Sequence, residues 1–179
     1  MGSILPLSPG KAKRYHYEYA KNGSCCVLLA FELHTGCRYV EVRQRRTAVD
    51  YAQFMQHLTQ TYYADVECIR LVQDNLHTHT SGSCYEVLDP EDAFDLSQRF
   101  EMHYTPKKGS WFNMADIEFA ALSTQCLDRR IGDVETLSEE VQAWTTQRNI
   151  NRTTVNWQFT QTKARSKLNR HYQSVKKLI

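Results

Sequence analysis

The stretch that most constrains the fold is residues 66–80, which read VECIRLVQDNLHTHT. The run from Ile69 to Val72 shows no clear polar-facing alternation, which predicts a buried central strand of a mostly parallel sheet. The run ends abruptly at Asp74 and Asn75. Because open α/β sheets carry their functional residues just beyond the carboxyl ends of strands, we expect a site to be built around Asp74.

The length and composition indicate a globular chain. Its 179 residues fit one domain with a sizeable core, and 41% hydrophobic and 23% charged residues are typical of soluble proteins. No apolar run approaches the roughly 20 residues that span a bilayer, and no charged-then-apolar leader opens the chain. We therefore expect a cytoplasmic protein without a membrane partner.

Two features of composition bear on chemistry. The six cysteines include no CxxC pair and mostly lie in apolar runs, so we interpret them as reduced core residues rather than disulfides or zinc ligands.

All 20 acidic residues lie at or before Glu140, whereas residues 141–179 carry eight basic residues and no acid. A basic tail on an acidic body indicates a polyanionic partner, with a solvated basic helix as the alternative.

Residues 1–13 are an irregular lead-in, and the elements follow in a definite order. Asn22-Gly23 and Thr35-Gly36 are turn signals that predict an antiparallel meander of strands over residues 14–20, 25–33 and 37–43. Apolar periodicity and breakers predict the remaining elements: a helix over 48–62 capped by Thr47, a strand over 66–73, short helices over 81–88 and 91–99, a strand over 100–104, and helices over 113–128, 134–148 and 160–172. The helix over 113–128 is apolar on nearly all sides, which predicts burial between layers.

This order resembles the ribonuclease H-like fold of polynucleotidyl transferases. Six segments match more narrowly: RYHYEY with NGS, RRTAVDYAQFMQHL, IRLVQDNLHTHT, YTPKKGSWFNMADIEF, LSTQCLDRRI, and W-x-F-T-x-x-x-A-R-x-K-L near the end. Together, over residues 15–172, they resemble the catalytic domain of bacterial insertion-sequence transposases, in the DDE-endonuclease family related to the Tc/mariner elements.

The resemblance implies an α/β fold with a ribonuclease H-like mixed sheet flanked by helices. It divides the chain into the lead-in 1–13, a partial catalytic domain over 14–150 and a basic helical extension over 151–179. It implies metal-dependent cleavage and transfer of DNA strands in a bacterial cytoplasm, with terminal inverted repeats and target DNA as partners.

The family holds two divalent metals with three carboxylates. Two such ions about 4 Å apart repel by on the order of 16 kcal/mol at an effective dielectric of 20, so bridging carboxylates are needed to offset the repulsion. Oxygen ligands favour Mg²⁺, with Mn²⁺ as a substitute.

By resemblance, Asp74 is the second acid of this triad and Asp116 the third, where many relatives have Glu. An Asp-Asn turn is the alternative for Asp74, and a helix start capped by Asn113 is the alternative for Asp116. Asn75 and His79 match the family's DN…H signature and would orient a metal-bound water or a DNA phosphate; a purely hydrogen-bonded loop is the other interpretation.

Glu118 and the pair His77 and His79 are not predicted to be metal ligands. Glu118 lies two residues beyond Asp116 and should face another side of the helix. His77 and His79 lack a third soft ligand for zinc.

Several basic residues are candidates for DNA contact, because cations bind phosphates. Lys107 and Lys108 also lie close in sequence to Trp111, and aromatic rings stack on bases. A solvated loop is the alternative for Lys107, Lys108 and Trp111. The candidates are Lys107, Lys108, Trp111, Arg45, Arg46, Lys163, Arg165, Lys167 and Arg170.

The chain departs from the family in one respect that affects activity. The family's first Asp lies on a strand upstream of the aromatic segment, but residues 1–14 contain no acid, and the first carboxylate is Glu18. The helix-turn-helix region of such transposases is also missing. We therefore expect the first strand to be absent, metal to bind poorly, and catalysis to require an upstream segment or a partner in an oligomer. The alternative is a non-catalytic DNA-binding remnant or regulator.

Overall fold

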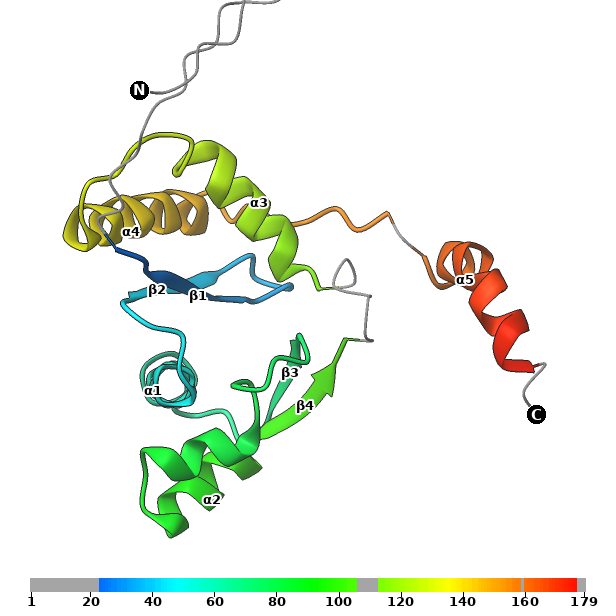
Figure 1. Ribbon diagram of the computed structural model, residues 1–179, viewed down its shortest axis with the longest axis horizontal. Coiled ribbons are helices and arrows are strands. Elements are labelled where there is room, and N and C mark those ends of the chain that lie inside the picture. Colours follow the sequence, from blue (N-terminus) through cyan, green and yellow to red (C-terminus); the bar gives the residue numbers. More distant parts are fainter. Residues whose placement is uncertain (1–22, 106–112, 159, 177–179) are drawn as a thin grey trace, which may run out of the picture.

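The computed structural model describes residues 23–105, 113–158 and 160–176, which form small sheets and helices (Figure 1). Their order is β1 (Cys26–Phe31), β2 (Arg38–Arg43), α1 (Ala48–His57), the π-helical turn η1 (Leu58–Tyr62), β3 (Ile69–Gln73), the 3₁₀ helix η2 (Ser81–Glu86), α2 (Pro90–Gln98), β4 (Phe100–Tyr104), α3 (Ala115–Gln125), α4 (Val134–Ile150) and α5 (Gln161–Lys176). The prediction of a mixed α/β chain is confirmed. The first predicted strand, over 14–20, lies outside the described residues.

Strands β1 and β2 form an antiparallel hairpin in which Cys26 pairs with Arg43 and Phe31 with Arg38. Gly36 turns the chain with a φ of 72°, which favours glycine. A Cβ at this position would lie 3.1 Å from the carbonyl oxygen of Arg152, so the turn packs directly against the chain that leaves α4.

Strands β3 and β4 are parallel, with Gln73 beside Tyr104. The expectation of a buried central strand is wrong for the described residues: β3 pairs there only with β4, and Val72 is 51% exposed. The cause is a polar outer face. Arg70 Nε lies 3.1 Å from Glu101 Oε2 in the next strand, and Val72 pairs with His103, so this face remains in water.

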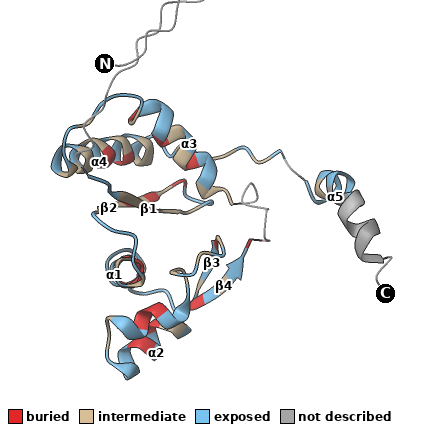
Figure 2. Ribbon diagram, in the orientation of Figure 1, coloured by how far each residue is buried: buried red, intermediate tan, exposed pale blue. Residues whose placement is uncertain are grey.

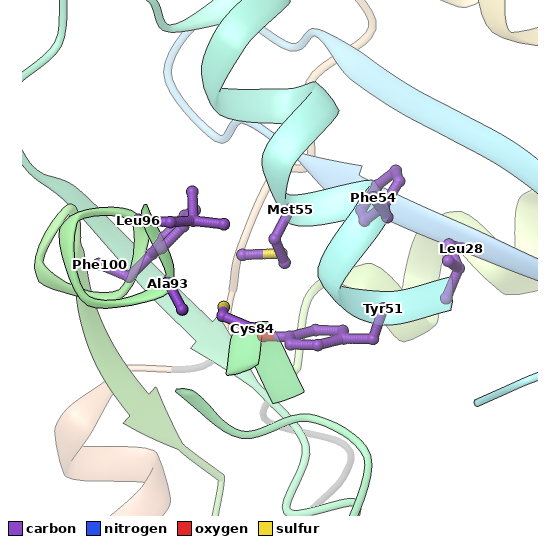
Figure 3. Close-up of a cluster of buried hydrophobic side chains, with 8 residues drawn as sticks. All are labelled: Leu28, Tyr51, Phe54, Met55, Cys84, Ala93, Leu96 and Phe100. Atoms are coloured by element: carbon purple, nitrogen blue, oxygen red, sulfur yellow. The ribbon is translucent and has the colours of Figure 1, made fainter. Parts of the chain in front are cut away.

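Helix α1 joins the two sheets through one hydrophobic cluster (Figure 3). Thr47 caps this helix as predicted, in a capping box with Asp50. The cluster draws on α1, β1, β4, α2 and η2 and consists of Leu28, Tyr51, Phe54, Met55, Cys84, Ala93, Leu96 and Phe100. Each large apolar side chain buried in this way contributes about 1.5–3 kcal/mol to folding.

A second cluster lies on the opposite face of the β1–β2 sheet, where Val40 meets Leu122, Cys126 and Val141. Figure 1 accordingly shows α3 and α4 on one side of this sheet and α1 on the other. Figure 2 shows buried residues along the facing sides of these elements, whereas the described part of α5 is mostly exposed. The body is therefore layered, with the basic extension outside the layers.

Two further expectations need correction. Helix α3 is not buried on all sides, because Ile117 is 39% exposed and the fully buried side chains include the charged Glu118. All six cysteines are free, as expected, but Cys25 and Cys68 are exposed and only Cys84 and Cys126 are buried. The apolar neighbours of Ile117, Cys25 and Cys68 predicted that these side chains are buried, but in the described part of the chain no other element packs over them.

Candidate active site

Asp74 follows the last residue of β3, at the carboxyl end of the parallel pair, and its side chain is 48% exposed. His79 Nδ1 lies 2.6 Å from Asp74 Oδ1. The turn between them is closed by a hydrogen bond from His79 N to the carbonyl oxygen of Leu76, 2.9 Å long. This short loop therefore fixes one oxygen of the Asp74 carboxylate.

The position of His79 is itself fixed from two directions. Its ring stacks on Tyr51 of α1, with centroids 4.7 Å apart. Its carbonyl oxygen accepts hydrogen bonds from Gln73 Nε2 at 2.9 Å and Tyr104 Oη at 3.2 Å. His79 Nε2 is buried and has no hydrogen-bond partner within the described part of the chain.

Tyr51 and Gln73 were not singled out from sequence, yet they connect the core to this loop. Tyr51 Oη donates a 2.8 Å hydrogen bond to Gln73 Oε1. Burial raises the pKa of Tyr51, and the hydrogen bond to Gln73 only partly opposes that rise. Tyr51 therefore stays protonated and acts as a donor at all ordinary pH values. The only sequence signal was that Tyr51 lies on the apolar face of its helix.

Asp116 lies in the first turn of α3, where the backbone begins to be helical. Ala115 N donates to Asn113 Oδ1 at 3.2 Å, and Asp116 N donates to the carbonyl oxygen of Asn113 at 3.1 Å. Asn113 therefore accepts a hydrogen bond just before the helix, but it is not the cap that the sequence suggested, because Met114 occupies the N-cap position. An acid at this place also complements the helix dipole.

The two acids interact. Desolvation by the surrounding protein raises the pKa of Asp116, and the negative charge of Asp74 raises it further. The charge of Asp74 at the end of β3 thus acts on Asp116 at the start of α3, a different element. A carboxyl group with a raised pKa, such as that of Asp116, is typical of functional sites, although ion-pair networks shift pKa values too.

Glu118 was expected to face away from Asp116, and it does. It is 1% exposed and forms ion pairs with Arg38 of β2 and with Arg148 of α4. Burial opposes ionisation of Glu118, but hydrogen bonds from both arginines outweigh that effect and hold its pKa below the usual value. The sequence hint was a charged residue within an apolar helix; nothing in the sequence identified its partners.

The remaining site candidates are distributed as follows. Asn75 and His77 are exposed, and among the described residues no three His, Cys, Asp or Glu side chains form a group that could hold a metal ion. Lys107, Lys108 and Trp111 lie outside the described residues.

The basic candidates that are described lie on the surface. Arg45 and Arg46 are exposed after β2, and Lys163, Arg165 and Lys167 are exposed on α5. Arg170 belongs to α5, but its side chain lies outside the described part. In the ranges 23–105, 113–158 and 160–176, no helix is long and apolar enough to cross a membrane.

A family model for the DDE superfamily endonucleases matches residues 5–138. The chain belongs to this superfamily. The match includes both Asp74 and Asp116 and ends before the basic residues of α5. Members of this DDE endonuclease superfamily act on DNA and generally use divalent metal ions. Neither the comparison with curated proteins nor that with solved structures found a match.

Proposed function

We propose that this chain is part of the catalytic domain of an insertion-sequence transposase that cleaves and transfers DNA strands in a bacterial cytoplasm. The observation that carries the proposal is the match of the DDE endonuclease family model to residues 5–138, which include both Asp74 and Asp116. Desolvation and the charge of Asp74 both raise the pKa of Asp116, which supports it. Two neighbouring carboxylates repel at neutral pH unless a cation lies between them. Membership in the DDE endonucleases supplies the class of chemistry.

The donor chemistry of the site fits Mg²⁺ or Mn²⁺, since both candidate ligands are carboxylates and hard cations prefer oxygen. When bound, a pair of such ions would activate the attacking oxygen and stabilise the leaving oxygen of a phosphodiester. His79 would hold Asp74 through Oδ1 and so restrict the direction of its carboxylate. Asn75, which is exposed beside Asp74, would contact a water or a DNA phosphate.

The DNA partner would be held through phosphates by the exposed Arg45 and Arg46 and by the cations of α5. In this proposal residues 14–150 form the partial catalytic domain, and 151–179 a basic extension that contacts terminal repeats or target DNA. Lys107, Lys108 and Trp111 belong to the same proposed surface by sequence alone.

A third carboxylate is needed to complete the site, and we propose that an upstream segment or a partner chain supplies it. What supports this is that, among the described residues, β1–β2 and β3–β4 are separate two-stranded sheets packed on the same helix, α1. A strand placed between them would unite both sheets and bring its acid to the end of β3. Without that strand, this chain alone would have little or no cleavage activity.

The metal site can be tested without catalysis. Millimolar Mn²⁺ should broaden the amide NMR signals around Asp74 and Asp116, and either Asp74→Asn or Asp116→Asn should abolish this. Asp95→Asn, which removes an exposed acid from α2, is the matched control and should leave it unchanged. Broadening that survives Asp74→Asn would contradict the proposal.

A second function is favoured by the absence of acids from residues 1–14 and of a three-ligand cluster from the described part of the chain. In that case the chain is a non-catalytic DNA-binding remnant or regulator that acts in a mixed oligomer. The coding sequence immediately upstream distinguishes the two. A reading frame with an Asp-bearing strand, joinable by frameshift, supports the catalytic role; stop codons throughout support the remnant. Robust Mg²⁺-dependent strand transfer by this chain alone would refute the need for a third acid.

A further inference from the structure

Glu118 is the centre of a buried ionic cluster that joins three elements. Its Oε2 accepts a hydrogen bond from Arg38 Nε of β2. From α4, Arg148 Nε donates to Oε2 and Nη2 donates to Oε1, both at 3.2 Å. Both carboxylate oxygens are therefore engaged, and α3 is tied to the sheet and to α4 at one point.

The partners of Glu118 are themselves fixed. Arg38 is 1% exposed and also donates to the carbonyl oxygens of Gly36 and Thr153, each at 2.5 Å. The backbone of Arg38 exchanges hydrogen bonds with the side-chain amide of Asn149, at 2.8 and 2.9 Å. The arginine cannot follow the helix if α3 turns, because four hydrogen bonds to the hairpin, α4 and the segment after α4 would be disturbed.

The apolar residues of α3 do not define its rotation equally well. They are spread around the helix, so that Ile117 and Ala120 are exposed while Leu122 is buried. A helix with apolar side chains on several sides could pack on the sheet in more than one rotation. A buried carboxylate with two fixed cationic partners permits one rotation, because every other leaves charges buried and unpaired.

The rotation of α3 decides where Asp116 points. Residues two positions apart on an α-helix project about 200° apart around its axis. When Glu118 faces β2 and α4, Asp116 faces away from them and is exposed.

We propose that Glu118 is a positioning residue, whose ion pairs with Arg38 and Arg148 fix the rotation of α3 and thereby the direction in which Asp116 projects from the helix. The inference rests on the proposed function only in that Asp116 is taken to be a metal ligand. Its physical content, the coupling of a buried ion cluster to the direction of an exposed acid, does not depend on metal.

Residual dipolar couplings of the α3 amides test the inference, because their periodic pattern along a helix reports its rotation. The variants are Glu118→Gln, which keeps the side-chain shape, and Arg148→Lys, a milder change should the first fail to fold. Leu96→Ala in the other core cluster is the control for general destabilisation. Both ion-cluster variants should shift the phase of the α3 pattern relative to β2, whereas Leu96→Ala should lower the melting temperature without that shift.

An unchanged α3 pattern in folded Glu118→Gln or Arg148→Lys would overturn the inference, and so would the same shift in Leu96→Ala. Mn²⁺ broadening, measured on the same samples, should be lost around both acids in Glu118→Gln, as it is expected to be in Asp116→Asn. If the wild-type chain shows no broadening while the α3 pattern still shifts in the variants, the positioning role stands and the proposed metal site fails.

Discussion

Desolvation and the negative charge of Asp74 together raise the pKa of Asp116, although Asp74 follows a strand of the second sheet and Asp116 opens a helix that packs on the first. This relationship depends on tertiary structure alone, since no local contact joins the two segments. Each of the following predictions tests part of the structure that maintains or uses it.

Asp74→Asn should lower the pKa of Asp116 toward its ordinary value, because the variant removes the repulsion and leaves only the desolvation. Carboxyl carbon chemical shifts followed through a pH titration would measure the change, with Asp95→Asn as the control. A raised pKa means that Asp116 favours the folded state most below pH 3.8, its ordinary pKa, and that this contribution is lost as pH rises through the folded-state pKa. An unchanged Asp116 titration in Asp74→Asn would show that the carboxylates do not interact.

Glu118→Gln should reduce the free energy of unfolding by about 3–5 kcal/mol at pH 7, because two arginines then lack their buried anion. Chemical denaturation would measure this. Arg70→Gln, which breaks the exposed pair with Glu101, should have little effect.

The same variant has a defined pH dependence. Because the pKa of Glu118 is lowered, its contribution is present above the ordinary value of 4.5 and is lost as pH falls through the folded-state pKa. The stability difference between wild type and Glu118→Gln should therefore shrink in acid. A difference that stayed constant from pH 7 down to acid unfolding would argue against an ionised Glu118.

Tyr51→Phe should cost about 1–3 kcal/mol, because the buried Gln73 Oε1 loses its donor. The effect should also reach the loop, since the same amide holds the carbonyl of His79. Amide hydrogen exchange at His79, compared between Tyr51→Phe and wild type, would show faster exchange. Tyr104→Phe removes a more exposed bond to the same carbonyl and should change exchange less; the reverse order would contradict this assignment.

Replacing Lys163 and Arg165 together with Gln should weaken binding to a short random-sequence DNA duplex. If each cation neutralises one phosphate, the slope of log K against log salt should fall in magnitude by about 2. Fluorescence anisotropy at several salt concentrations would measure it. Replacing Arg70 and Arg129 together with Gln is the charge-matched control, because these arginines are paired with Glu101 and Glu140 on the body of the protein. An equal loss of slope in the control would assign the effect to net charge alone.

The sequence predicted local structure where the signal was local. Thr47 is followed by Asp50 at the spacing of a capping box, and the observed helix begins there with both hydrogen bonds. Thr35-Gly36 forms the predicted turn between β1 and β2, and the periodicity over 134–148 predicted α4, whose Leu137 and Val141 belong to the second cluster. Such features depend on a few neighbouring residues, so no long-range information was required.

The failures share the opposite cause. Val72 was expected inside because of its apolar neighbours, but its exposure is decided by which strands pair with β3 and by the polar residues of β4. The partners of Glu118 come from β2 and α4, far away in sequence, and Tyr51 reaches His79 only through the packing of α1. Resemblance pointed to Asp74 and Asp116, but not to the residues that hold them in place.

Strand β1 contributes to both hydrophobic clusters, Leu28 to the one below the sheet and Val27 and Leu29 to the one above. Asp74 therefore follows a strand that packs in the first cluster, and Asp116 begins a helix that packs in the second. The distance between the two acids depends on how both clusters pack against β1. A change in the volume of a single core side chain such as Phe54 would alter that distance without touching an acid. Substitutions in the core would therefore change the activity of such a chain without replacing either acid. A survey of loss-of-function substitutions should find them at core positions as well as at Asp74 and Asp116.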